Sequence, residues 1–537
     1  MKEKIARWEL LFVQYLKRDW KKMILWILGI GLFSAGYVPA FVEIAKGQGL
    51  LGMYEVMQNP AMISMVGPTP AESGSEYTIG AMYAHTMVLF CGLFAMTVSI
   101  LHVVGHTREE EEAGLTELVR SFQIGRQANS LAVTVQTFFI NILLVLFIGA
   151  VMISFGEDAI SVEGSFLFGA SIGMAGMIGV AIALVMAQIM PTSSGAKGAS
   201  LGMMGLLYIL RAGTDVSNID LSMINPMGWT YLTNPFTDNN WMPLAFGLVF
   251  CFAVVMIAFT LEGARDMGAG YLPEKEGRSN AKKSLLSVRG LFVKINKGII
   301  IGWLIAFALM GAAYGSIYGD MQAFIGSNEL IAQMFSQADV SMEESFTGTI
   351  MMVMIVLVSI LPIAVVNKLY AAESRSFLSQ LYATKVTRSR FYWTSIGLAS
   401  LAGIVGILAA AGSLGATALA VTEGKGTMEF LDFLAAGYNF LPSVLFFVGL
   451  AAFALGWLPK LGKVVYIYLG YSFLLNYFEG IINLPEWFSK TAIQSWIPRM
   501  PTEEFDLTVF TAIMVFGIVL MIVGYFGYNR RDMDEKA

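Results

Sequence analysis

Blocks of about 20 apolar residues, separated by short charged joints, recur along the whole chain of 537 residues and limit its fold more than any other feature. A helix needs about 20 apolar residues to cross the hydrocarbon core of a bilayer. Only 14% of the residues are charged, against about 25% in soluble domains, and the mean hydropathy is +0.65. The sequence therefore predicts an all-α polytopic membrane protein.

Twelve spans are expected from these blocks, and the charges of the joints orient them. The predicted spans are 23–42, 81–104, 130–154, 165–190, 198–213, 242–262, 298–317, 346–367, 392–420, 436–457, 464–483 and 507–528. With the N-terminus inside, all but five of the 34 Lys and Arg lie in cytoplasmic segments; the five are Lys46, Lys425, Lys490, Arg499 and, within a span, Arg211. This positive-inside bias predicts that both termini are cytoplasmic.

The segment before the first span is rich in both aromatic and basic residues. It is too charged and too long for the start of a cleavable signal, so the first span is expected to be retained. Its aromatic residues can share one helical face while its cations gather at the end, and a weaker version spans 285–297. Amphipathic interfacial helices are therefore expected before spans 1 and 7.

An internal repeat relates the two halves of the chain. Residues 11–37 align with 288–314, and Glu110, Leu115 and Leu118 align with Glu373, Leu378 and Leu381, with Arg126 meeting Arg388 after a one-residue slip. The tetrapeptides ARDM (264–267) and RRDM (530–533) close the two halves. The predicted organisation is a first six-span half at 1–267, a linker at 268–287 and a second half at 288–537. Because six is even, the repeat is parallel.

A charged joint after the second span carries the most informative motif. Four consecutive glutamates, 109–112, are followed by an apolar stripe of Leu115, Leu118 and Phe122 at helical spacing. The segment at 375–388 is its counterpart in the second half. One interpretation is a solvated helix that only ends a span. The duplication instead favours docking to a partner with twofold symmetry.

The pattern E-x-x-x-G-x-x-E-L, which begins at Glu110, resembles the coupling segment of type-2 ABC export permeases. Five further motifs, RAGTD, INPMGW, RDMGAGYLPEKEGR, GWLIAFALMGAAYGS and SWIPRMPTEEF, stand in the order seen in one branch of that family. That branch comprises double-length permeases described as exporters of polyketide antibiotics and other drugs, and it lies in the bacterial cell membrane.

The resemblance implies that two copies of a separate ATP-binding subunit dock under the two joints and bind ATP and Mg²⁺, with no cofactor in this chain. The implied coupling residues are Glu110, Glu112, Leu115, Glu117, Leu118, Arg126, Glu373, Leu378, Gln380, Leu381 and Arg388. The second joint departs from the pattern, because Gln380 stands where Glu117 is expected and Phe377 where Gly114 is expected. The implied cargo is a hydrophobic, drug-like compound.

No phosphate-binding loop G-x-x-x-x-G-K-[ST] occurs in the chain, so we expect no ATPase site of its own. The nearest match, GWLPKLGKV, ends in Val464 where a Ser or Thr must hold the metal ion. A proton-coupled multidrug carrier remains the alternative, with Glu479 as its best acidic candidate. Two cysteines in spans and three scattered histidines predict no disulfide and no metal site, and no feature predicts nucleic-acid binding.

Two further groups of residues are candidates for sites. Arg211 and Asp215, spaced i, i+4 near the outer end of the fifth span, form either a structural ion pair or an outer gate. By family analogy the substrate path follows spans 2, 5, 8 and 11, where the candidates are Met87, Phe90, Phe94, Met203, Met204, Tyr208, Met351, Met354, Tyr468, Tyr471 and Phe473. The alternative for the methionines is plain core packing.

Overall fold

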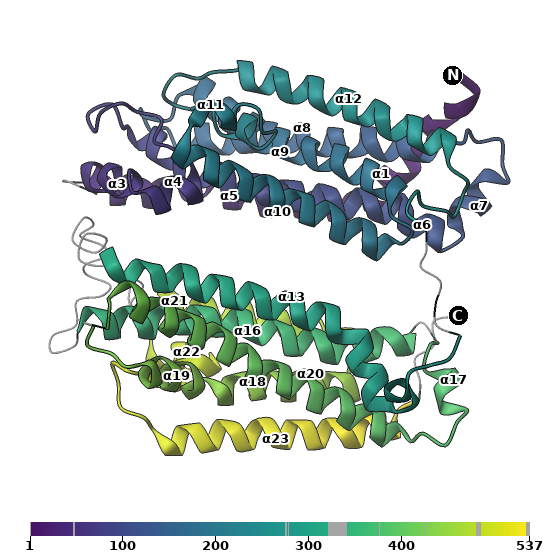
Figure 1. Ribbon diagram of the computed structural model, residues 1–537, viewed down its shortest axis with the longest axis vertical. Coiled ribbons are helices and arrows are strands. Elements are labelled where there is room, and N and C mark those ends of the chain that lie inside the picture. The colour runs from purple at the N-terminus through teal and green to yellow at the C-terminus, as the bar shows by residue number, and fades with distance from the viewer. Residues whose placement is uncertain are drawn as a thin grey trace. The chain divides into compact units, whose positions relative to one another are not determined.

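The computed structural model describes residues 2–46, 49–273, 277, 279–320, 341–374, 376–424, 426–478 and 485–532. These residues are helical and contain no β-strand (Figure 1). The chain divides into two compact units, Met1–Gly277 and Arg278–Ala537. The boundary between the units falls inside the predicted linker at 268–287.

The first unit is built on six long helices. They are α1 (Trp8–Ala35), α5 (Ile79–His106), α8 (Ala128–Ser154), α9 (Val162–Ile189), α10 (Ser193–Ser217) and α12 (Met242–Ala264). Three short helices join α1 to α5, namely α2 (Val38–Ile44), α3 (Gly49–Met57) and α4 (Pro60–Val66). The short α11 (Ile219–Ser222) and the 3₁₀ turn η2 (Gly228–Thr230) join α10 to α12.

The second unit repeats this order of long helices. It contains α13 (Val288–Ser316), α16 (Met342–Ser374), α18 (Arg388–Val421), α19 (Phe430–Asn439), α20 (Leu441–Trp457), α21 (Val464–Phe478) and α23 (Leu507–Arg530). The predicted tenth span is divided between α19 and α20, because the chain leaves helical geometry at Phe440, just before Pro442. Short elements follow at η3 (Lys283–Leu286), η4 (Ile317–Asp320), η5 (Pro459–Leu461), α22 (Glu486–Ser489) and η6 (Ile493–Trp496).

A helix lies at each of the twelve predicted span positions, and in the described part of the chain ten segments are long and apolar enough to cross a membrane. The two exceptions are α10 and α21. The helix α10 carries Lys197, Arg211 and Asp215 together with several Gly and Ser residues, which lowers its hydropathy. The described part of α21 has only 15 residues, and positions 479–484, including the acidic candidate Glu479, lie outside the described residues.

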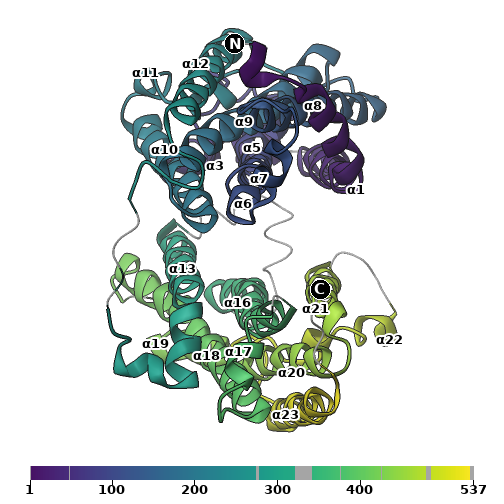
Figure 2. The same cartoon turned by 90° about the vertical axis from the view of Figure 1, so that its right-hand side faces the viewer.

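The core of each unit lies around its second and fourth span positions. In the most apolar 18-residue stretch of each helix, 83% of the residues are buried in α9 and 67% in α5, against 22% in α1 and in α12. In the first unit, α5 and α9 are therefore central and α1 and α12 peripheral (Figure 2). Side-chain caps fix where several helices begin: Thr78 caps α5, Ser161 caps α9, Thr192 caps α10 and Asp506 caps α23.

Equivalent helices pack in the same pairs in both units. The first helix packs on the third (α1 on α8, α13 on α18), and the last packs on the fourth (α12 on α9, α23 on α20). The pair α20–α23 approaches backbone to backbone at glycines: a Cβ on Gly449 would lie 2.3 Å from the Gly517 oxygen, and one on Gly456 would lie 2.1 Å from the Gly524 oxygen. Small residues allow this close packing between apolar helices.

The predicted interfacial helices before spans 1 and 7 are not separate elements, which corrects that expectation. Helix α1 runs without a break from Trp8 to Ala35, and α13 from Val288 to Ser316. The amphipathic face of α1, with Leu11 and Tyr15, packs on Ala128 and Ala132 at the start of α8 instead of lying flat on lipid. The sequence predicts that this amphipathic segment lies on the membrane surface, but in the structure its apolar face packs on α8.

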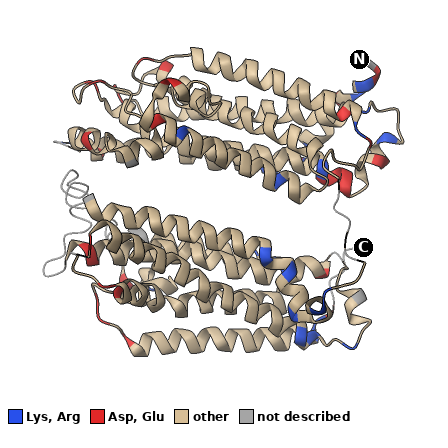
Figure 3. Ribbon diagram, viewed as in Figure 1, with Lys and Arg blue, Asp and Glu red and all other residues tan. Residues whose placement is uncertain are grey.

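The residues before α1 form a strap across this packing. The Gly125 N–H donates to the Ala6 carbonyl at 3.0 Å, and the Gln127 N–H donates to the Lys4 carbonyl at 2.7 Å. Lys and Arg gather at the same end of the first unit, where α6 and α7 lie, and at the α17 end of the second unit (Figure 3).

Candidate functional site

The joint between α5 and α8 folds into two short helices, α6 (Arg108–Glu112) and α7 (Leu115–Arg120). Between them Gly114 has φ 73°, a left-handed conformation that glycine adopts without steric cost. This turn ends α6 and redirects the chain into α7, so the two short helices point in different directions.

Glu111 is the centre of a buried ion network at the base of α6. Its two oxygens accept hydrogen bonds from both terminal nitrogens of Arg265 at 2.8 and 2.7 Å, and from the Gly268 N–H at 2.7 Å. Arg108 donates to the same carboxylate at 3.0 Å and to the carbonyls of Pro191 and Gly268. All three charged side chains are less than 10% exposed. The network joins the ends of α5, α9 and α12.

The other three glutamates of the run are also bound within the first unit. Glu109 pairs with Lys197 of α10 at 2.5 Å, and Glu110 pairs with Arg18 of α1 at 2.7 Å. Glu112 accepts hydrogen bonds from the N–H and hydroxyl of Ser193, the first residue of α10, at 2.7 and 2.6 Å. The four glutamates therefore fasten α6 to α1, α10 and the segment after α12. We call Arg108–Glu112 with these partners the hub.

The part of the joint that faces outward is apolar. Leu115 is 47% exposed, Leu118 63% and Phe122 66%, and Glu117 is exposed beside them. We call these four residues the first tip. Arg126, behind the tip, is exposed but donates to the carbonyls of Glu262, at 3.2 Å, and Arg265. Of the predicted coupling residues in this half, Leu115, Glu117 and Leu118 are exposed, whereas the polar groups of Glu110, Glu112 and Arg126 already have partners within the unit.

The second unit builds a similar junction around Glu373. Arg531 binds Glu373 through both terminal nitrogens at 2.5 and 2.7 Å, as Arg265 binds Glu111. Arg388 donates to the Arg531 carbonyl at 2.7 Å, as Arg126 does to that of Arg265.

These contacts correct the predicted register of the repeat at this joint. Glu373 corresponds to Glu111 and not to Glu110, which gives the same separation as Arg126 to Arg388 and removes the one-residue slip. Ser376 has φ 58° and its N–H donates to the Glu373 carbonyl, as the Gly114 N–H donates to that of Glu111. Ser376 therefore stands in the place of Gly114, and Phe377 in that of Leu115.

With this register, Phe377 takes the place of Leu115 in the second unit, and we call Phe377 and Leu381 the second tip; its exposed apolar surface is smaller than that of the first tip. Phe377 is 63% exposed, whereas Leu378 is buried and Leu381 half-buried. The side chain of Gln380 lies outside the described residues. Helix α17 (Ser379–Tyr382) is held by a hydrogen bond of 2.9 Å between the hydroxyls of Tyr382 and Tyr528, and burial raises the pKa of Tyr382.

Arg211 and Asp215 lie at the opposite end of the first unit, inside the protein. Both side chains are fully buried and 2.8 Å apart, and Arg211 also donates to the carbonyls of Ser64 and Met65 at the end of α4. Asp215 accepts from the hydroxyls of Ser222, at 2.5 Å, and Tyr231. The pair thus ties α4, α10 and the segment after α11 together within one unit.

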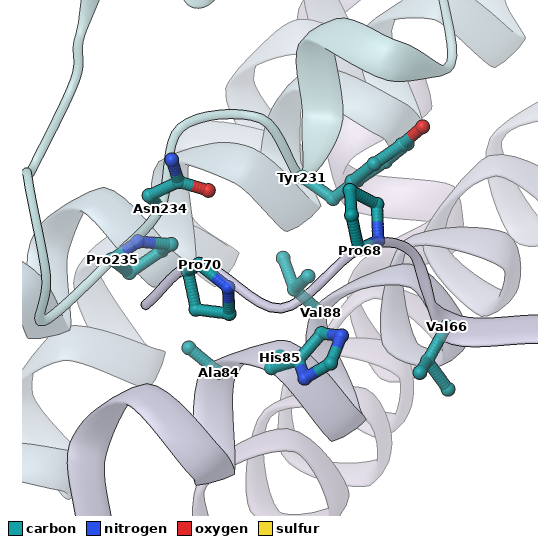
Figure 4. A pocket seen from close by; sticks show the side chains of 9 residues that line it. All are labelled: Val66, Pro68, Pro70, Ala84, His85, Val88, Tyr231, Asn234 and Pro235. Atoms are coloured by element: carbon teal, nitrogen blue, oxygen red, sulfur yellow. The ribbon is translucent and has the colours of Figure 1, made fainter. Parts of the chain in front are cut away.

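Tyr231 and His85 line a small pocket beside this network, between residues 66–70 and 231–235 (Figure 4). Its volume of about 10 Å³ holds no more than about one water molecule. The histidine is fixed by Tyr77 and by the Gly67 carbonyl, each at 2.9 Å. This pocket is too small for a transported compound.

The predicted path residues divide into buried and exposed groups. Met351 and Met354 are fully buried in the core of the second unit and Met87 is buried in the first, so they serve as core packing in this structure. Phe90 and Phe94 are exposed and contact Phe33 of α1, Phe90 with a tilted ring and Phe94 edge-on. The others, Met203, Met204, Tyr208, Tyr468, Tyr471 and Phe473, are partly buried.

Sequence reasoning missed the residues that hold the hub. Arg108, Arg265 and Arg531 are not among its predicted sites, and Glu111 was not singled out within the run of glutamates. A usable signal was present, because ARDM and RRDM place Arg265 and Arg531 at equivalent ends of the two halves. An arginine repeated at the same structural position needs an acidic partner repeated with it.

Comparison with known proteins agrees with the helical membrane architecture. Residues 285–529 match the family model of the multidrug efflux system permease Rv1217c, C-terminal domain. The multidrug efflux system permease protein Rv1217c of Mycobacterium tuberculosis (strain ATCC 25618 / H37Rv) is 24% identical over 538 residues, which cover 97% of this chain and 94% of that protein. The chain is therefore similar to a multidrug efflux permease along nearly its whole length, and its residues 285–529 match the model of that protein's C-terminal domain.

Proposed function

We propose that this chain is the permease subunit of an ATP-driven ABC exporter that moves hydrophobic, drug-like compounds out of the cell. Two copies of a separate ATP-binding subunit dock on the first and second tips, bind ATP and Mg²⁺, and hydrolyse the ATP. The observation that carries the proposal is the duplicated junction: an arginine–glutamate pair, a left-handed turn and an exposed apolar residue recur in both units.

The hub gives the first tip a route to the long helices. A displacement of α7 reaches α6 through one turn, and α6 is held to α1, α10 and the end of α12 by ion pairs and hydrogen bonds. Because these contacts involve several elements and one of them, Glu111 with Arg265, is buried, the helices are expected to move with the tip as one body. A loop whose only role was to end a membrane span would not need ion pairs and hydrogen bonds to three other helices.

The proposed membrane arrangement is twelve spans in two parallel six-helix repeats, in the bacterial cell membrane. The tips, the hub and both termini face the cytoplasm, where Lys and Arg are favoured. The Arg211–Asp215 pair then lies on the outer side. We retain the hypothesis that it closes an outer gate, which opens during transport.

A groove in the second unit fits the proposed substrate class. It lies between α20 and α21, has a volume of about 390 Å³, and is lined by apolar and aromatic side chains that include Phe446, Phe453 and Tyr468. Sites for drug-sized ligands have volumes of about 300–1,000 Å³ and are mostly apolar. Tyr468 is one of the residues expected on the path, so this groove is the first place to look for bound compound.

The tips supply the decisive experiment. Changing Leu115 and Leu118 together to Asp is expected to weaken binding of the ATP-binding subunit at least about 100-fold, because docking would bury two leucines worth roughly 1.5–3 kcal/mol each. The chain is purified with a candidate ATP-binding subunit, and complex formation is measured by light scattering and the ATPase rate in nanodiscs. Phe377→Asp tests the second tip separately.

The matched control is Ile224→Asp, an equally exposed apolar residue in the segment between α11 and η2, at the other end of the unit. It is expected to leave the complex intact. Undiminished binding by the double variant would contradict the proposal. If the purified chain alone moves a hydrophobic cation in response to a proton gradient, the alternative of a secondary carrier is correct.

A further inference from the structure

Two of the three histidines meet a carboxylate inside the first unit, although their positions in the sequence give no sign of a cluster. His102 and His106 lie one turn apart on α5, and Asp19 lies on α1. All three are buried, and one ligand-type atom from each lies within 4.8 Å of the others. The proposed transport function does not use this cluster.

The hydrogen bonds of His106 require a cation between it and Asp19. Its Nδ1–H donates to the His102 carbonyl at 3.0 Å, so in the neutral ring Nε2 carries a lone pair. Yet Nε2 lies 2.7 Å from Oδ2 of Asp19, which is also an acceptor. Two lone pairs repel at this distance, so either a proton or a metal ion must lie between the two atoms.

His102 keeps one ring nitrogen available as a second ligand. Its Nε2–H donates to Oε1 of Gln136 at 3.2 Å, which leaves the lone pair on Nδ1. The ring of Trp26 meets His102 edge-on at 5.2 Å, and that of Tyr15 meets His106 at 5.0 Å, so both imidazoles are fixed. A metal-binding histidine typically has its other nitrogen hydrogen-bonded in this way.

We propose that Asp19, His102 and His106 bind one divalent transition-metal ion of the Zn²⁺ class, which fastens α1 to α5 beside the hub. Two imidazoles and one carboxylate form a common Zn²⁺ donor set, and a fourth position can hold water. That position opens to a pocket of about 410 Å³ lined by His102 and His106 together with Glu109 and Glu110. Arg18 and Lys22 line the same pocket, which gives the ion an entry path from solvent.

Binding requires the side chains to rearrange, because the three ligand atoms lie within 4.8 Å of one another and must close in around one ion. Two ligands of one tetrahedral Zn²⁺ lie about 3.3 Å apart, so the Asp19 carboxylate must withdraw from His106 by a few tenths of an ångström. Lys22 and Arg18 lie 3.3 and 3.5 Å from Asp19 and compete with the ion. Their side chains are 63% and 43% exposed, so they can turn toward solvent.

The test uses the full chain with a histidine-free affinity tag, purified without chelator. Zinc is quantified by mass spectrometry, and Zn²⁺ is then titrated into chelator-stripped protein by calorimetry. We expect about one Zn²⁺ per chain and at least a tenfold weaker affinity for His102→Gln. The matched control is His85→Gln, at the other end of α5, where both ring nitrogens already have partners; it should bind Zn²⁺ like the wild type.

Asp19→Asn is the second variant if His102→Gln does not fold, and it is expected to lose the ion as well. No saturable Zn²⁺ binding by the wild type overturns the proposal and assigns the cation between Asp19 and His106 as a proton. Equal binding by the wild type and both site variants overturns it too, by placing the ion elsewhere. None of these readouts requires an ATP-binding subunit, so they are independent of the proposed function.

Discussion

Replacing Glu111 with alanine is expected to lower the free energy of unfolding of the first unit by about 3–5 kcal/mol, because it leaves two buried arginines without their carboxylate. Arg265 loses both charge-assisted hydrogen bonds, and Arg108 loses its only acidic partner among the described residues. The Gly268 N–H loses its acceptor as well. No surface position in the joint combines these three losses.

The measurement is the thermal unfolding of the protein in nanodiscs, followed by tryptophan fluorescence. A loss of this size should lower the melting temperature by on the order of 10 °C. Glu117→Ala, a carboxylate of the same joint that is exposed, is the control and should leave the melting curve unchanged. A Glu111→Ala variant that melts like the wild type would show that the hub contributes nothing to stability. Glu373→Ala should repeat the effect in the second unit.

Replacing Asp215 with asparagine is expected to cost the first unit a similar amount, about 3–5 kcal/mol, since Arg211 then remains charged and enclosed with no acidic partner among the described residues. The Nε of Arg211 has no partner among the described residues, so the guanidinium is already short of one hydrogen bond. The ends of α4 and α10 lose the group that ties them. Melting of the variant against the wild type measures the cost.

The same network distinguishes a structural pair from an outer gate through a milder variant. Tyr231→Phe removes one hydrogen bond to Asp215 and should cost about 1.5–3 kcal/mol, so the chain still folds. If the pair closes a gate, this variant raises the basal ATPase rate of the complex and weakens its response to substrate. If the pair is only structural, the melting temperature falls while the ATPase rate and its response stay unchanged.

The sequence predicted the long helices well because their signal is local. Apolar blocks of sufficient length, bounded by charge, mark α5, α8, α9, α12 and α23 to within a few residues of the observed ends. The interfacial helices were predicted wrongly for the opposite reason. An amphipathic pattern predicts that the apolar face will be buried but does not identify the surface that buries it. Here Leu11 and Tyr15 pack on Ala128 and Ala132, which lie more than a hundred residues away in the sequence.

The site was predicted in part. The apolar stripe of the first tip is exposed as expected, but the adjacent glutamates have partners within the chain. Charge type and helical spacing show where a carboxylate lies, not which cation it meets, and Arg18, Lys197 and Arg265 come from three separate segments. The register predicted for the second joint was wrong for a related reason. The alignment matched the leucines of the two joints, but the left-handed turn that defines the register is made by Ser376 and not by a glycine, so the sequence does not show it.

The strap between residues 4–6 and 125–127 imposes an order on biosynthesis. Its two segments are separated by roughly 120 residues, so at about 5–20 residues per second the N-terminal segment waits about 6–25 seconds for its partner to be translated. During that interval Ala128 and Ala132, which pack on Leu11 and Tyr15 in the folded unit, have not yet been synthesised. In a ribosome-bound chain shorter than about 127 residues, this amphipathic face therefore meets the lipid headgroups without its partner on α8. The affinity of this segment for the membrane surface is therefore relevant during synthesis, and it is lost once the third long helix has been inserted and covers the apolar face.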